Sequence, residues 1–306
     1  MDHKELLSTV ESFRNNCLDK NISFSETSRF TTPYSGSEVR FGTLDSGRRV
    51  VVKVSARKLG AEREWGGLVR TFEAGLSVPE PIALVNTQIG HPALVTEQME
   101  GKLMYYTSQN ELRYRLGQMV KRMHDAVPVD SRRWMEAGKS DLTYYESRLH
   151  HWWIANAEVL GVKTDSQALF KELVPMMATY CNSVVPRFNH NDLHDGQVIV
   201  VGENITIIDF EDWIEESPMN DLAYYLYSTI RTGTIDEQFG YFLDGYLETE
   251  ILSEVEKGAL MFYLLYISCR SVNQFKLRRV GLAEIALSTH QKVVKYIKRE
   301  RLWKNP

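Results

Sequence analysis

Cysteine is scarce in this sequence, and no hydrophobic run is long enough to cross a membrane. The three cysteines, Cys17, Cys181 and Cys269, are far apart and odd in number. Their spacing argues against a disulfide framework and against a zinc site, and it favours a cytoplasmic protein. The longest apolar run, 259–267, is much shorter than the roughly 20 residues that span a bilayer. We therefore expect no membrane segment, and the acidic N-terminal residues lack the apolar core of a secretory signal.

Fixed-period repeats and low-complexity segments are also absent, which excludes solenoid proteins and long disordered arms. The 306 residues are 25% charged and 43% hydrophobic, which is ordinary for a globular enzyme, and the length allows two lobes. The net charge of −4 hides a basic segment, 270–306, that carries ten Lys or Arg residues and two Glu. No aromatic platform or groove-reading motif accompanies this charge, so we interpret the segment as the solvent face of a terminal helix and expect no nucleic-acid partner.

The most informative part of the sequence is HNDLHDGQ at 190–197, followed by IIDFED at 207–212. Between them, two β-branched runs are joined by a turn with Gly and Asn, which predicts a β-hairpin. A hairpin holds its ends close together, so we expect Asp192 and Asp209 to face one small volume. Two carboxylates and the carboxamide of Gln197 in one pocket suit divalent-cation and phosphate chemistry.

Apolar periodicity places the other elements. Alternation and turn residues predict strands at 38–44, 48–55, 81–85 and 93–96. Helical spacing predicts helices over 2–20, 57–72 and 110–124, and a helical pattern over 238–296.

The order of H-x-D, hairpin and D-F is similar to the catalytic and metal loops of the protein-kinase-like superfamily. HNDLHDGQ, IIDFED and a later NDLA at 220–223 most resemble the aminoglycoside phosphotransferase branch of small-molecule kinases. The resemblance runs from about Ser35 to Tyr246, and the stretch 62–82 also resembles the atypical RIO protein kinases. It implies an α+β, bilobal protein-kinase-like fold, with a nucleotide-binding lobe at 1–100 and a mainly helical lobe with the acceptor site at 101–306.

The resemblance also assigns roles in the central loop. Asp192 corresponds to the general base that orients the acceptor hydroxyl, and Asp209 to a Mg²⁺ ligand. Gln197 stands where the family usually has Asn as a second metal ligand. Asp221 corresponds to an acid that ties the backbone of the catalytic loop. We expect His124 and His190 to be structural, and His194 stands where serine/threonine kinases have a lysine.

Lys53 lies in the apolar run VVKV, where a lysine is expensive to bury without an anionic partner. A snorkelling or edge-strand lysine would also fit this pattern. The run resembles the kinase strand whose lysine holds the α and β phosphates and pairs with a glutamate on the next helix. Glu62 and Glu64 compete for that pairing, and spacing to the turn at 78–79 favours Glu64.

Two further parts of a nucleotide site follow from the resemblance. The stretch TEQMEG at 96–101 is similar to the hinge between the lobes, which implies backbone contacts to a base at Glu97 and Met99. The phosphate-covering loop departs from the family, because Ser35, Gly36 and Gly42 do not form G-x-G-x-x-G. We still expect backbone contacts at Ser35 and Gly36.

The sequence thus predicts a Mg²⁺-dependent phosphotransferase that moves the γ-phosphate of ATP or GTP to a hydroxyl of a small molecule. An aminoglycoside or other antibiotic, a sugar or an amino alcohol fits as the acceptor. Acids after the metal loop, at 211, 212, 215 and 216, either line the acceptor cleft or form a solvated loop. A RIO-like protein serine kinase and a nucleotide-binding pseudokinase that acts through a partner are the alternatives. We expect a monomer or a homodimer.

Overall fold

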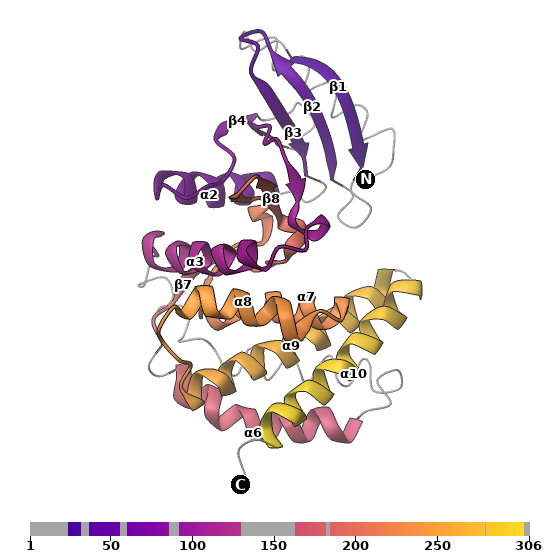
Figure 1. Ribbon diagram of the computed structural model, residues 1–306. Coiled ribbons are helices and arrows are strands. Elements are labelled where there is room, and N and C mark those ends of the chain that lie inside the picture. Colours follow the sequence, from indigo (N-terminus) through magenta and orange to yellow (C-terminus); the bar gives the residue numbers. More distant parts are fainter. Residues whose placement is uncertain are drawn as a thin grey trace. The chain divides into compact units, whose positions relative to one another are not determined.

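The computed structural model describes residues 24–31, 37–55, 60–85, 92–129, 163–181, 184–278 and 280–302. Their contacts divide the chain into two units, which are drawn with their elements in Figure 1. Unit 1 comprises residues up to 108 together with 195–213, and unit 2 comprises 109–194 together with 214–306. The division into functional lobes 1–100 and 101–306 stays a prediction, because these units are defined by internal contacts and not by function.

Unit 1 contains a five-stranded antiparallel sheet with the order β1-β2-β3-β5-β4. The strands are β1 (Phe24–Thr31), β2 (Glu38–Leu44), β3 (Arg49–Val54), β4 (Pro81–Val85) and β5 (Ala93–Glu97). In β3, Val50, Val52 and Val54 are buried in one apolar cluster with residues of β4 and β5. Successive strand residues point to opposite faces, so Lys53 projects from the other face of the sheet. The predicted strand pattern is confirmed.

The remaining elements of unit 1 are a helix and a small sheet. Helix α2 (Gly60–Glu73) is followed by Gly75, whose positive φ of 73° is a conformation that glycine adopts without a Cβ penalty. This confirms the helix expected at 57–72 from residue 60 onward, and residues 57–59 lie outside the described part. Strands β8 (Val198–Val201) and β9 (Asn204–Ile207) form the predicted hairpin, and β6 (Lys102–Leu103) pairs with β8.

Unit 2 is mainly helical in its described part. Its helices are α3 (Asn110–Ala126), α6 (Lys163–Cys181), α7 (Met219–Thr232), α8 (Ile235–Leu247), α9 (Glu254–Arg278) and α10 (Val280–Leu302). The core contains fully buried aromatic rings, with Tyr225 stacked on Phe242 at a centroid distance of 4.2 Å. Two short strands, β7 (Arg187–Asn189) and β10 (Ile214–Glu216), pair antiparallel, and β7 is followed by the loop that carries the expected catalytic residue Asp192.

The expected α+β architecture is present, with a sheet-containing unit 1 and a mainly helical unit 2. Among the described helices, none combines the length and the apolar character that a membrane span requires. The helix expected at 2–20 lies outside the described residues.

Helices α3 and α8 approach each other closely because glycine stands at their contact. A Cβ added at Gly245 would collide with the backbone of Tyr114, whereas a Cβ at Gly240 on the same helix would meet nothing within 4 Å.

Gly240→Ala should stabilise the protein by up to about 1 kcal/mol through helix propensity. Gly245→Ala should destabilise it by about 1–3 kcal/mol, because the helices must move apart. Urea unfolding checks this, and equal stability of the two variants would contradict the close packing.

Candidate active site

A buried lysine organises the candidate site in unit 1. Three carboxylates surround the Nζ of Lys53: Glu64 at 2.9 Å, Asp209 at 2.5 Å and Glu211 at 3.2 Å. The lysine comes from β3, Glu64 from α2, and the other two acids from the segment after the hairpin. The ion pair expected between Lys53 and Glu64 is therefore present, and the side chain of Lys53 is only 13% exposed.

The cluster perturbs the protonation of its members. Burial lowers the pKa of Lys53, but the charges of Glu64, Asp209 and Glu211 outweigh it and hold the pKa well above its ordinary value. Burial raises the pKa of Glu64 to about 7, and the attraction of Lys53 opposes this shift only in part because Asp209 and Glu211 repel a third negative charge. Three carboxylates thus face one ammonium group, and negative charge is in excess.

This excess of carboxylate oxygens fits a divalent cation. One carboxylate oxygen from each of Glu64, Asp209 and Glu211 lies within 4.8 Å of the others. Mg²⁺ prefers oxygen ligands, usually one or two protein carboxylates together with phosphate oxygens and waters. Asp209 is the member best placed to hold it, because its side chain is 31% exposed, compared with 6% for Glu64 and 11% for Glu211.

The hairpin brings Gln197 to Asp209. Gln197 stands in the 3₁₀ turn η2 (Asp195–Gln197) before β8, and its side-chain amide donates to Oδ2 of Asp209 at 3.1 Å. The Ile208 amide donates to the Gln197 carbonyl at 2.9 Å and closes the base of the hairpin. Because the other carboxylate oxygen of Asp209 contacts Lys53, Asp209 joins the lysine to the carboxamide. A half rotation of the amide would present its oxygen to a cation.

Asp209 adopts a left-handed backbone conformation with φ 67°. This conformation costs a non-glycine residue about 1–3 kcal/mol, and it concentrates at functional sites. Asp209 thereby turns the chain from β9 into η3 (Phe210–Asp212), whose Phe210 is fully buried. The turn allows Asp209 and Glu211 to contact the same lysine.

In unit 2, Asp221 holds the backbone of the catalytic loop. Its two carboxylate oxygens accept hydrogen bonds from the amides of His190 at 2.8 Å and Asn191 at 2.7 Å. Asn191 has φ 65°, and its side chain accepts a bond from Asn220 at 2.9 Å. The backbone-tying position expected for Asp221 is confirmed, and the loop that carries Asp192 is held by fixed partners.

Asp192 is an accessible acid of this loop, with a side chain that is 46% exposed. His194, which stands where serine/threonine kinases have a lysine, places Nε2 at 3.9 Å from the Asp192 carboxylate. Asp192 belongs to unit 2 and Asp209 to unit 1. Their expected convergence on one volume stays a prediction, as does the role of Asp192.

The support of Asp221 extends further into unit 2. His124 is buried between the Asp221 carboxylate, at 3.1 Å from Nε2, and the Tyr246 hydroxyl, at 2.9 Å from Nδ1. This confirms the expectation that His124 is a hydrogen-bonded packing residue. Glu216 is also structural, because its buried carboxylate accepts bonds from the Ser217 amide and the Tyr263 hydroxyl.

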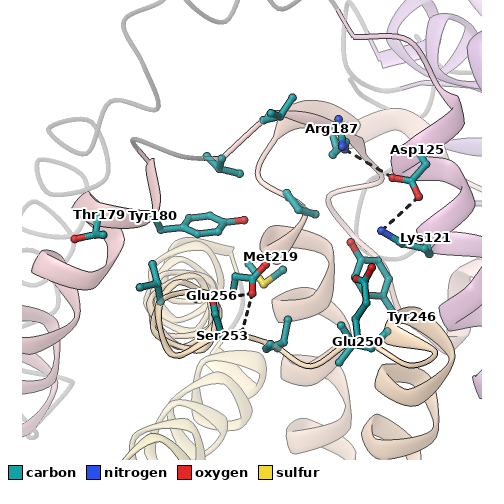
Figure 2. A pocket seen from close by; sticks show the side chains of 16 residues that line it. Lys121, Asp125, Thr179, Tyr180, Arg187, Met219, Tyr246, Glu250, Ser253 and Glu256 are labelled. Carbon is teal, nitrogen blue, oxygen red and sulfur yellow. Dashed lines mark hydrogen bonds and ion pairs between the residues drawn. The ribbon is translucent and has the colours of Figure 1, made fainter.

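The same network reaches a pocket of about 540 Å³ beside β7 (Figure 2). Lys121 and Arg187 both point toward Asp125 on its wall, at 3.4 and 3.9 Å. Tyr246 lines the pocket as well. The wall of this pocket is therefore linked to the catalytic loop through His124 and Asp221.

The expected hinge continues from β5 in unit 1. The Glu97 amide donates to the Glu80 carbonyl at 3.0 Å, and the Gln98 amide donates to the Arg49 carbonyl at 3.1 Å. Glu97 would therefore meet a base through its carbonyl and not through its N–H. Met99 is partly buried. Its contact with a base stays a prediction, and Ser35 and Gly36 lie outside the described residues.

Glu211 is the member of the cluster whose position could not be assigned from the sequence. It stands two residues after Asp209, among four acids that read equally well as a solvated loop or an acceptor cleft. The left-handed turn at Asp209, which leads directly into η3, leaves no signal in the sequence. Glu62, the competitor of Glu64, is half-buried, and Glu64 pairs with the lysine.

A family model described as the phosphotransferase enzyme family (APH) matches residues 26–257 of this chain. The chain belongs to this family. The predicted enzyme class, a small-molecule phosphotransferase, is thereby confirmed. No protein in a curated set matches the sequence.

Solved structures with the same fold resemble this phosphotransferase over nearly its whole length. An aminoglycoside 2′-phosphotransferase IIIa complexed with GDP is 13% identical, with a TM-score of 0.66 and coverage of 95% of this chain and 98% of that chain. The aminoglycoside phosphotransferase APH(4)-Ia, with ADP and hygromycin B, is 14% identical, with a TM-score of 0.64 and coverage of 93% of this chain and 98% of that chain. An amicoumacin kinase with AMP-PNP, Ca²⁺ and its antibiotic is 16% identical, with a TM-score of 0.61 and coverage of 96% of both chains.

The raised pKa of Glu64 should make the stability of the phosphotransferase depend on pH. Between pH 4.5 and about 7, folded Glu64 holds a proton that the unfolded chain releases, so the free energy of unfolding should fall as the pH rises. Glu64→Gln cannot titrate, so its stability relative to the wild type should improve across this window. Urea unfolding of both proteins at several pH values measures the difference. A difference that stays constant with pH would contradict the raised pKa.

Proposed function

We propose that the protein transfers the γ-phosphoryl group of ATP or GTP to a hydroxyl group of a small molecule, with Mg²⁺ as the metal. The observation that carries this proposal is the cluster of Lys53, Glu64, Asp209 and Glu211, in a chain of the phosphotransferase enzyme family. A fixed cation surrounded by excess carboxylates suits a metal-bound triphosphate, because it offers positive charge to phosphate oxygens and oxygen ligands to the metal.

Each side chain has a part in this reaction. Lys53, held by Glu64, binds the α and β phosphates. Asp209 and Glu211, with Gln197 beside them, hold Mg²⁺, which supplies charge neutralisation of the phosphate oxygens when bound. Asp192 orients the acceptor hydroxyl and accepts its proton as the new O–P bond forms and the bond to the leaving nucleoside diphosphate breaks. Because an ordinary aspartate has a pKa of about 3.9, its contribution is mainly positioning.

The acceptor is an aminoglycoside or another antibiotic, a sugar or an amino alcohol. This choice is supported by the ligands of the similar structures, which include hygromycin B, kanamycin, spectinomycin and amicoumacin. The same structures contain adenine and guanine nucleotides, and one contains Ca²⁺. Glu97 and Met99 contact the base, and Ser35 and Gly36 the phosphates. We place the enzyme in the cytoplasm as a monomer or a homodimer, with a role in antibiotic resistance if the acceptor is an antibiotic.

A thermal-shift screen of antibiotics, sugars and amino alcohols with Mg²⁺ and nucleotide present identifies the acceptor, since a ligand that binds the folded state raises the melting temperature. Hits are then tested for nucleotide-dependent phosphorylation. Phosphate transfer to at least one small molecule is expected. Transfer to proteins alone would favour a RIO-like protein kinase, and nucleotide binding without any transfer would favour a pseudokinase.

Exchange of either aspartate should separate chemistry from binding. Asp192→Asn should lower turnover by about 100- to 10,000-fold, a range typical of general acid–base groups, and leave Mg-nucleotide affinity nearly unchanged. Asp209→Asn should weaken Mg-nucleotide binding by at least about tenfold, because a metal ligand is lost. Asp45→Asn, in an exposed turn, is the control. Steady-state kinetics and calorimetric titration measure both quantities, and wild-type turnover in both variants would refute these roles.

A further inference from the structure

The segment that follows the metal-binding turn is fastened to α2 by reciprocal hydrogen bonds. The indole Nε1–H of Trp213 donates to the Arg63 carbonyl at 2.5 Å. The Arg63 guanidinium donates back to the Trp213 carbonyl, from Nε at 3.1 Å and from Nη2 at 2.5 Å, and also to the Asp212 carbonyl at 3.3 Å. All of these groups belong to unit 1. The contacts fix both the indole ring and the backbone at the end of η3.

The ring of Trp213 fills a space that glycine leaves on α2. A Cβ at Gly67 would lie 2.6 Å from Trp213 Cδ1 and 2.9 Å from Phe210 Cβ, which is too close for any side chain. At the neighbouring Gly66, a Cβ would meet only Trp213 Cζ2 at 3.8 Å, an ordinary contact. Arg70, one turn further along α2, places its guanidinium 4.8 Å from the centroid of the Trp213 ring. The helix and the segment therefore pack as one piece, for which Gly67 is required.

This piece carries three of the four members of the charged cluster. Glu64 follows Arg63 directly on α2, and Asp209 and Glu211 precede Trp213 by four and two residues. Lys53 attracts Glu64, Asp209 and Glu211, but one ammonium group balances only part of their negative charge, and the like charges repel each other. A further restraint that keeps α2 next to η3 therefore helps to hold the three acids together. The bonds between Arg63 and Trp213 supply that restraint without touching the lysine or the acids.

Resting on the proposed function, we propose that Trp213, Arg63 and Gly67 are positioning residues for the metal and nucleotide site. Their contacts fix α2 against η3, so that the carboxylates are already gathered around Lys53 when Mg-nucleotide arrives. The site is thus preorganised, and its affinity for the metal-bound nucleotide depends on a packing contact outside the charged cluster. Loss of the contact lets α2 and η3 separate, and the metal-dependent part of nucleotide binding falls.

The adjacent glycines provide a matched pair for the test. Gly66→Ala and Gly67→Ala make the same change in helix propensity, but only the second collides with the ring and with Phe210. The dissociation constants of fluorescently labelled ATP and GTP are measured with Mg²⁺ and again in EDTA. In Gly67→Ala, the ratio of the constants in EDTA and with Mg²⁺ should be about tenfold smaller than in the wild type, a typical effect of a residue that supports metal ligands. Gly66→Ala should keep the wild-type ratio of the two constants.

Trp213 variants keep the test decisive if Gly67→Ala does not fold. Trp213→Ala removes both the indole ring and its Nε1–H donor and should reduce the Mg²⁺-dependent gain as Gly67→Ala does. Trp213→Phe keeps an aromatic ring but lacks the donor, so it should recover only part of the gain. A merely structural role would lower the unfolding midpoint and leave the ratio of the constants unchanged. A wild-type ratio in Trp213→Ala would overturn this inference alone. A wild-type protein that gains no affinity from Mg²⁺ would overturn the proposed function as well.

Discussion

The structure of unit 1 depends on a buried ammonium group that must be neutralised. Lys53 projects from the face of β3 opposite its valine core, where an unpaired charge would be very costly. Glu64 meets it there from a helix, and Asp209 and Glu211 meet it from the segment after the hairpin, more than 150 residues away in the chain. The requirement for charge neutralisation therefore links strand, helix and hairpin, and it explains why the hairpin belongs to unit 1.

The three carboxylates carry more negative charge than Lys53 can neutralise, and this excess makes the site suitable for binding a metal ion. With more carboxylates than cations, the cluster retains affinity for further positive charge, and burial keeps the pKa of Glu64 near 7. The cost is a strained turn at Asp209 and repulsion among the acids. Packing of Trp213 on Gly67 and Arg63 offsets that cost. In unit 2, Asp221 holds the backbone of the catalytic loop in a comparable way.

Much of this arrangement could be predicted from the sequence. The hairpin, the helix with Glu64 and the ties made by Asp221 and His124 follow from turn residues, periodicity and resemblance to a family. Glu211 and Trp213 could not be assigned in this way. Their positions depend on a left-handed turn at an aspartate and on the absence of a Cβ at Gly67, and neither leaves a periodic signal. A glycine inside a helix reads as a weak point until its neighbour is known.

Whether the cluster around Lys53 holds the metal can be seen in a crystal structure of the complex with a non-hydrolysable nucleotide and Mn²⁺, whose anomalous scattering locates the ion. We expect an anomalous peak within coordination distance of a carboxylate oxygen of Asp209, with Lys53 directed at the phosphates. An anomalous peak elsewhere, with Asp209 and Glu211 making no contact with the ion, would contradict it.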